Sequence, residues 1–130
     1  MPETFAEICA KTGRKEIEFA LPVDGSNKVK ADICRDKLWL IAKCMNGKKK
    51  VDFTDTDQVK YTPWHEIIPD GERPFGFRLA FVGFVSARDY ASLGARPPFL
   101  KKEDAIYAGK QWVEIWEEWY HYMNLAFQEF

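Results

Sequence analysis

Apolar residues recur every three or four positions near the end of the chain, the spacing of one face of an α-helix. A long amphipathic helix carrying several tryptophans is therefore expected over 103–123. A similar stripe predicts a helix over 27–46, and Gly47 supplies the left-handed residue that commonly ends a helix. The apolar positions are Cys34, Leu38, Ile41, Ala42 and Met45 in the 27–46 helix, and Ala105, Ala108, Trp112, Trp116, Trp119 and Met123 in the 103–123 helix.

A shorter helix is predicted at the beginning of the chain. Thr4 precedes it as the N-cap, and Glu7, three residues later, completes the sequence signature of a capping box. Gly13 ends this helix. Residues 14–27 contain proline, glycine and serine, and this composition predicts a connecting loop.

The middle of the chain has the alternating pattern of β-strands. A strand over 58–68 contains Pro63, which restricts it to an edge or a bulged position. A strand over 76–87 alternates as far as Gly83, where a bulge is expected to shift the phase. A weaker third strand is expected over 94–100. The pattern thus predicts a single α+β domain over 1–130: two N-terminal helices, a small antiparallel three-stranded sheet, and a long C-terminal amphipathic helix packed on it.

Composition excludes several classes of protein. Hydrophobic residues make up 46% of the chain, enough to build a core, so wholesale disorder is excluded. The net charge of −1 argues against both a polybasic DNA-coating protein and a strongly acidic DNA mimic. The three cysteines form no C-x-x-C pair, and neither a signal peptide nor a membrane-spanning run is visible. These features predict an intracellular protein in a reducing compartment, without membrane contact.

Charge is distributed unevenly along the chain. Residues 28–50 carry eight basic and two acidic side chains, whereas 103–130 carry six acidic and one basic. Such a molecule can neutralise its own ends, assemble with a second copy, or offer one end to a charged partner. The cations near the end of the 27–46 helix also complement its dipole. The predicted basic patch comprises Lys43, Lys48, Lys49 and Lys50.

Residues suited to catalysis or metal binding are sparse. Asp55 begins a spacing that resembles a calcium loop, but Lys60 stands where such a loop needs glycine, and Pro63 interrupts it. Asp55 and Asp57 are instead expected to cap a turn. Cys34 lies on an apolar helix face, where a small buried hydrophobe is the simpler interpretation. We therefore predict no catalytic residue, no metal, no cofactor and no enzymatic activity.

Cations and aromatic residues alternate over the predicted sheet. Bases stack on aromatic faces while cations hold phosphate, so this mixture suits single strands or small nucleotides. The alternative is an amphipathic sheet with a solvated outer face. The C-terminal helix also carries more aromatic residues than one face can bury, which favours a partner or homodimer contact. The residues concerned are Lys60, Tyr61, Trp64, Arg73, Phe75, Arg78, Arg88 and Tyr90 on the sheet, and Tyr120, Tyr122 and Phe127 on the helix.

Three segments together resemble a widespread group of small proteins from phages and integrated mobile elements. They are Lys60-Tyr61-Thr62-Pro63-Trp64-His65, Gly94-Ala95-Arg96 and Tyr107-Ala108-Gly109-Lys110-Gln111-Trp112. The chain departs from the group's pattern at His65, where an aromatic residue is usual, at Arg96-Pro97-Pro98-Phe99, and at Lys102, where Ser or Thr is usual. The resemblance supplies no catalytic residue. It implies a phage or prophage accessory protein, acting in the cytoplasm of a bacterial host.

Gly109 gives the last of these segments a physical meaning. Glycine within a helix costs about 1 kcal/mol relative to alanine, so close approach of a strand or of a partner backbone is expected there. Arg96 is expected to meet Tyr107. Two interpretations remain open, namely structural locking of sheet to helix and a ligand or partner site. The predicted ligand- or partner-binding residues are Lys60, Tyr61, Trp64, Arg88, Tyr90, Arg96, Tyr107, Lys110 and Gln111.

The chain has surplus aromatic residues, two ends of opposite charge and few residues suited to catalysis. These features favour a protein that works by binding. We expect an inhibitor of a host defence system, either an anti-CRISPR-like protein that blocks a Cas effector or a sponge for a nucleotide signal. The alternative is a nucleic-acid-binding accessory protein of a mobile element. The expected partners are thus a host defence protein or complex, a nucleotide or nucleic acid, and in addition a second copy of the chain.

Overall fold

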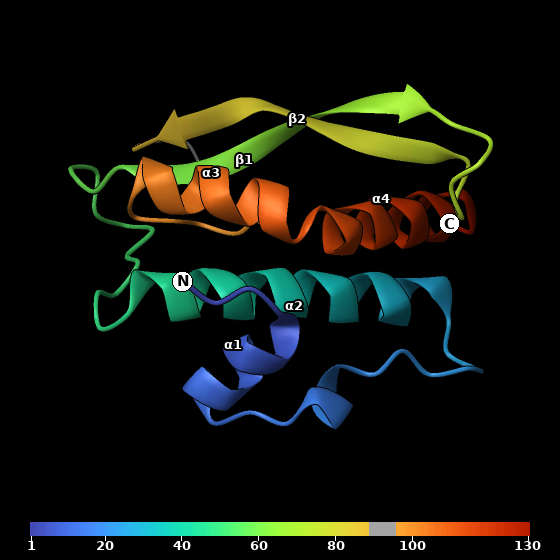
Figure 1. Cartoon of the computed structure of the whole chain (residues 1–130), viewed down its shortest axis with the longest axis horizontal. Helices are drawn as coiled ribbons and strands as arrows, with labels where there is room; N and C mark the ends of the chain where they lie inside the picture. Colours follow the sequence, from blue (N-terminus) through green and yellow to red (C-terminus); the bar gives the residue numbers. More distant parts are fainter. Residues whose placement is uncertain (89–95) are drawn as a thin grey trace.

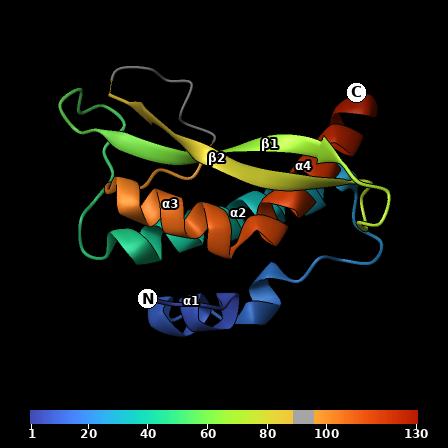
Figure 2. The ribbon, with the colours of Figure 1, turned by 45° about the horizontal axis from the view of Figure 1, so that its top comes forward.

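The computed structural model describes residues 1–88 and 96–130, which form an α+β fold of helices covering one face of a β-hairpin. In Figure 1 the hairpin lies at the top, α3 and α4 run end to end beneath it, and α2 lies below them. Figure 2 shows α1 on the side of α2 away from the hairpin. The elements are α1 (Phe5–Thr12), the 3-10 helix η1 (Glu16–Phe19), α2 (Asn27–Asn46), β1 (Lys60–Pro69), β2 (Phe77–Ala87), α3 (Lys102–Gln111) and α4 (Val113–Gln128).

Helix α1 begins and ends as the sequence predicts. The Thr4 hydroxyl accepts a hydrogen bond from the backbone N–H of Glu7 at 3.2 Å, and Gly13 has a φ of 72°. The Glu7 carboxylate accepts from the Glu3 N–H, so the reciprocal bond of the box is displaced by one residue. Part of the predicted loop instead forms η1, whose Phe19 ring meets Phe5 edge-on at 5.3 Å. One short turn gives no periodic pattern that a sequence could reveal.

Helix α2 has the predicted bounds. The Ser26 hydroxyl accepts from the Val29 N–H at its start, and Gly47 with a φ of 64° ends it. The apolar stripe is buried as expected, because it faces both α1 and α4. The buried members are Cys34, Leu38, Ile41 and Ala42, with Met45 partly buried.

The sheet has two strands where three were predicted. Strands β1 and β2 pair antiparallel, and the expected bulge is present at Gly83: Trp64 pairs with Gly83 but His65 with Phe81, and Gly83 has a φ of 154°. Of the predicted third strand, 94 and 95 lie outside the described residues. Among those that are described, Phe99 alone pairs with the hairpin, through two backbone bonds with Tyr61 of 2.7 and 2.8 Å. The two prolines before Phe99 have no N–H to extend the ladder.

The C-terminal helix is also divided, whereas the sequence predicted one continuous helix packed on the sheet. Trp112, with φ −113° and ψ 32°, separates α3 from α4. Helix α3 covers the hairpin, while α4 packs mainly along α2. Trp112, Trp116 and Trp119 are all buried. Because the helical spacing of the tryptophans continues across the junction, the periodicity hides the break.

Gly109 is the point where α3 and the hairpin come closest. A Cβ added there would lie 2.5 Å from the Pro63 Cβ and 3.0 Å from a ring carbon of Phe81. The His65 Nε2 also lies 2.8 Å from the Gly109 carbonyl oxygen. The close approach predicted from the glycine is therefore present, and a strand of the same chain makes it.

Candidate functional site: a basic pocket beside helix α2

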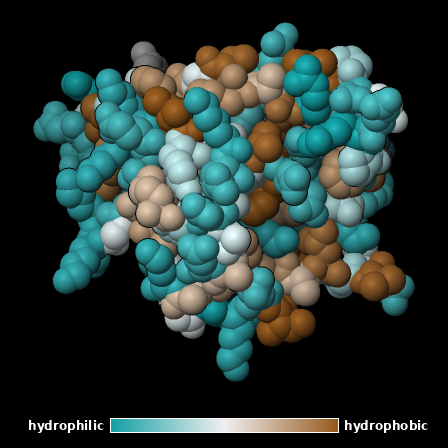
Figure 3. All heavy atoms as spheres, in the orientation of Figure 1, coloured by the Kyte–Doolittle hydropathy of each residue, from teal (hydrophilic) through white to brown (hydrophobic). Residues whose placement is uncertain are grey.

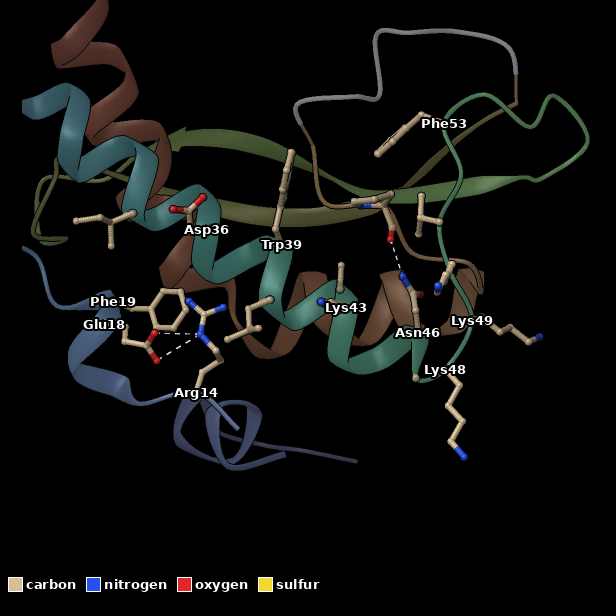
Figure 4. A pocket seen from close by; sticks show the side chains of 17 residues that line it. Arg14, Glu18, Phe19, Asp36, Trp39, Lys43, Asn46, Lys48, Lys49 and Phe53 are labelled. Atoms are coloured by element: carbon tan, nitrogen blue, oxygen red, sulfur yellow. Dashed lines mark hydrogen bonds and ion pairs between the residues drawn. The ribbon is translucent and has the colours of Figure 1, made fainter. Parts of the chain in front are cut away.

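A cavity of about 780 Å³ lies along the C-terminal half of α2, a size typical of small-molecule sites. Figure 4 shows side chains from α2, from η1 and its flanks, and from the segment that follows α2 around it. We call it the basic pocket. Its lining residues are Arg14, Glu18, Phe19, Ile33, Asp36, Trp39, Leu40, Ala42, Lys43, Asn46, Gly47, Lys48, Lys49, Lys50, Val51, Phe53 and Pro98.

The charge of the basic pocket is dominated by the predicted basic patch, of which all four lysines line it. Within residues 1–88 and 96–130, none of these lysine side chains forms an ion pair. Arg14, in contrast, is paired with Glu18 at 3.1 Å. A hydrogen bond from the Lys15 N–H, helped by Arg14, holds the pKa of Glu18 below its usual value. The pocket therefore has unneutralised positive charge at the end of α2 and an ionised carboxylate near its other end.

Two aromatic rings in the pocket are unusually exposed. Trp39 on α2 is 41% exposed, and Phe53 on the segment after α2 is 52% exposed. The Arg35 guanidinium lies 5.6 Å from the centre of the Trp39 ring. Aromatic faces beside lysine amino groups are the combination that binds a base together with its phosphate. The prediction from sequence missed both rings, although Trp39 lies off the buried stripe of α2, a signal that could have revealed it.

Asn46 shapes the end of the pocket. Its Nδ2 donates to the Pro98 carbonyl at 3.0 Å, and its Oδ1 accepts from the Leu100 N–H at 2.9 Å. These bonds join the last turn of α2 to the segment that leads into α3. Asn46 is therefore occupied in holding the wall of the pocket and is not available as a ligand-binding amide.

Most of the cations predicted on the sheet contact other groups of the protein. Lys60 is buried, and its amino group donates to the Asp55 carbonyl at 3.0 Å. Arg96, which was expected to meet Tyr107, instead lies 4.8 Å over the Trp64 ring and donates to the Tyr120 hydroxyl at 3.1 Å. Arg73 and Arg78 pair with Glu117 at 2.8 Å and Asp70 at 3.9 Å. The sheet thus presents fewer unpaired cations than its sequence indicates.

The Tyr107–Trp112 segment contacts the N-terminal residues. The Tyr107 hydroxyl donates to the Pro2 carbonyl at 2.6 Å, burial raises its pKa, and the Gln111 amide donates to the Glu3 carbonyl at 2.7 Å. Lys110 lies 5.2 Å over the Phe81 ring.

The remaining predicted site residues are dispersed. The Tyr61 ring packs edge-on against Phe84 at 5.5 Å, and Arg88 is exposed. Tyr90 lies outside the described residues. The structure therefore brings the basic patch into one pocket but does not gather the other predicted residues that it describes into a single site.

A second hollow of about 580 Å³ lies between the hairpin and α4 and is mainly apolar. His121 stacks on Phe75 there at 4.1 Å, and burial lowers its pKa. Tyr120 and the exposed Phe127, two of the surplus aromatics, also line it. Figure 3 shows hydrophobic side chains at the surface over the hairpin. The remaining lining residues are Ile67, Phe77, Met123 and Asn124.

The surroundings of the cysteines and of the loop aspartates indicate structural roles for both. Burial raises the pKa of all three thiols, that of Cys34 to about 12. Asp52 accepts from the Thr54 N–H at 2.9 Å and Asp55 from the Asp57 N–H at 2.9 Å, as expected of turn residues. In the described part of the chain, no three His, Cys, Asp or Glu residues gather in a metal-binding group. No described helix has the length and apolarity needed to cross a membrane.

Comparison with known proteins gives no family to which the chain can be assigned. No family model, no curated protein sequence and no solved structure matches it.

Proposed function

We propose that this protein sequesters a small nucleotide in the basic pocket and does so without catalysis. In the phage or prophage context implied by the sequence resemblance, such a protein inhibits a host defence system by removing its nucleotide signal. The observation that carries the proposal is the meeting of four lysines with two exposed aromatic rings around one cavity of about 780 Å³. The lysines can thus bind the phosphate and the aromatic rings can stack on the base within one small site.

The location of the unpaired cations favours a small ligand over a long nucleic acid. A single strand is held along a continuous basic groove with stacking platforms. On the hairpin, Lys60 and Arg73 have partners within the protein, as does Arg96 beyond it. The lysines of the basic patch, unpaired among the described residues, are instead concentrated at one end of a single pocket. A nucleic-acid-binding accessory role remains the alternative, and it predicts tighter binding to oligonucleotides than to mononucleotides.

The apolar hollow beside α4 favours a second candidate, an inhibitor that blocks a protein effector such as a Cas nuclease. Apolar and aromatic side chains at a surface are characteristic of the centres of protein interfaces. Phe127 is 71% exposed and Ile67 59% exposed in this region. This candidate predicts stable co-elution with an effector complex, which Phe127→Asp prevents and which substitutions in the basic pocket leave unchanged.

The test of the sponge proposal is recovery of bound nucleotide. The protein is purified at low salt from cells carrying a defence system, denatured by heat, and the released material is identified by absorbance at 260 nm and mass spectrometry. We expect nucleotide with the wild-type protein and none with Lys48, Lys49 and Lys50 all changed to Glu. A charge-matched control changes Lys28, Lys101 and Lys102, which lie outside the pocket, and should retain nucleotide. Equal recovery of nucleotide from both triple variants would exclude the basic pocket as the nucleotide-binding site.

A further inference from the structure

We propose that the basic pocket is selective for a guanine nucleotide, with the base toward Asp36 and the phosphate toward the lysines. This inference rests on the proposed function and adds the chemical class of the ligand. It comes from the order of the side chains along α2. Figure 4 shows Asp36, Trp39, Lys43 and Asn46 following one another along this helix.

The pocket changes charge from one end to the other. Asp36 and Glu18 line one end, Trp39 follows Asp36 by three residues, and Lys43 follows Trp39 by four. These spacings place successive side chains on one face of a helix. At a rise of 1.5 Å per residue, Asp36 and Lys43 are separated by about 10 Å along the axis. This separation is comparable with the span from the outer edge of a base to its phosphate.

The charges fix the direction of the ligand. The four lysines, none of which is ion-paired among the described residues, attract a phosphate, whereas the Arg14 charge at the other end is neutralised by Glu18. The end of α2 presents carbonyl groups, so the phosphate must be held by lysine amino groups and not by backbone N–H groups. Figure 4 shows Lys48 and Lys49 extending outward at this end, and their flexible stems allow the amino groups to reach an anion at the rim.

The aromatic and acidic groups at the other end determine which base fits. Trp39 offers a ring for stacking, and Asp36 is the carboxylate beside it. Among the described residues Asp36 forms one ion pair, at 3.6 Å with Arg35, whereas Glu18 is bound by Arg14 and by the Lys15 N–H. Asp36 therefore keeps acceptor capacity for a base.

Guanine is the base that matches a carboxylate. Its N1–H and N2 amino group are adjacent donors, which two carboxylate oxygens can accept together. Hypoxanthine keeps the N1–H and lacks the amino group. Adenine presents an amino donor next to an unprotonated ring nitrogen, which a carboxylate repels. The predicted order of affinity is therefore guanine, then hypoxanthine, then adenine.

The test compares GMP, IMP and AMP by isothermal titration calorimetry at one low ionic strength. We expect the wild-type protein to bind GMP about tenfold more tightly than AMP, with IMP between them. Asp36→Asn should remove most of this preference, because GMP loses its charged acceptor while AMP no longer faces a repelling carboxylate. Asp36 is exposed, so the variant should fold, and the wild-type comparison tests selectivity even without it.

The outcomes separate the two proposals. Equal binding of the three nucleotides, lost in the Lys48, Lys49 and Lys50 triple variant, would overturn guanine selectivity and support the sponge function. A preference for AMP would overturn the selectivity in the same way. Absence of binding by all three nucleotides would overturn this inference, and absence of nucleotide in the purified protein as well would overturn the proposed function.

Discussion

The His65 Nε2 lies 2.8 Å from the carbonyl oxygen of Gly109 and joins β1 to the last turn of α3. A carbonyl can only accept, so the neutral imidazole carries its proton on Nε2. The bond links two of the three segments that make this chain resemble the phage group. In this protein those segments lock the hairpin to the helix, which favours the structural interpretation of Gly109.

The protonation of His65 should make stability depend on pH. Burial between the Phe81 and Trp116 rings lowers its pKa below 6.5, and its Nδ1 is buried without a hydrogen-bond partner among the described residues. Below pH 6.5 the unfolded chain binds a proton that the folded chain resists, so stability falls as pH decreases through this window.

His65→Gln keeps an N–H donor and removes the titration. Urea unfolding at pH 7.5 and 5.0 should show a larger loss of stability for the wild type than for His65→Gln, because only the wild type has His65 to protonate. The contribution of His121 is present in both proteins and cancels in this comparison. Parallel losses in the two proteins would mean that His65 does not titrate differently on folding.

Gly109→Ala should destabilise the protein although alanine is the better helix former. The added methyl group would overlap the Pro63 Cβ, which belongs to a rigid ring on a paired strand. Overpacking typically costs about 1–3 kcal/mol and exceeds the helix-propensity gain of about 1 kcal/mol. We expect a net loss of about 1 kcal/mol by urea unfolding. Gly71→Ala, whose Cβ would meet nothing within 4 Å, is the control and should change stability by less than about 0.5 kcal/mol.

The cysteines should react slowly in the folded protein. Cys9 and Cys34 are buried, and the pKa of Cys34 is raised to about 12, so the nucleophilic thiolate is scarce at pH 8. A thiol-reactive dye should modify only Cys44 in the native state, and three thiols after unfolding in urea. Rapid native reaction of Cys34 would contradict its assignment as a buried hydrophobe.

Trp39→Ala should weaken nucleotide binding without unfolding the protein. The ring is 41% exposed and lies off the buried stripe of α2, so its loss leaves the core intact. Stacking of a base on an aromatic ring contributes about 1–3 kcal/mol, which corresponds to a loss of about fivefold to 150-fold in affinity. Trp64→Ala on the hairpin, outside the pocket, is the matched control and should bind nucleotide normally.

The sequence predicted the elements whose signals are local. The bounds of α2, the cap at Thr4 and the bulge at Gly83 follow from periodicity, hydrogen-bonding side chains and a glycine. The break at Trp112 was not predictable, because the helical spacing of apolar residues continues through it. The prediction of a third strand was wrong because the two prolines before Phe99 lack the N–H donors that would have extended the pairing.

The candidate site was predictable only in part, for a similar reason. Lys43 and Lys48–50 cluster along the sequence, so the basic patch could be identified before the fold was known. Phe53 follows these lysines on the same segment, whereas the η1 residues reach the pocket through tertiary packing alone. The cations of the hairpin alternate with aromatic residues as in a binding surface, but whether each is unpaired depends on partners distant in sequence, such as Glu117 for Arg73.

The most direct test of the central claim is the titration of GMP into three forms of the protein at low salt: the wild type, the variant with Lys48, Lys49 and Lys50 changed to Glu, and the charge-matched variant of Lys28, Lys101 and Lys102. The account predicts saturable binding by the wild type and by the charge-matched variant, and at least tenfold weaker binding by the pocket variant, since each charged hydrogen bond to phosphate contributes about 1.5–3 kcal/mol. Binding of equal strength by the pocket variant would contradict the assignment of the basic pocket as the nucleotide site, and no binding by the wild type would contradict its selectivity for a guanine nucleotide.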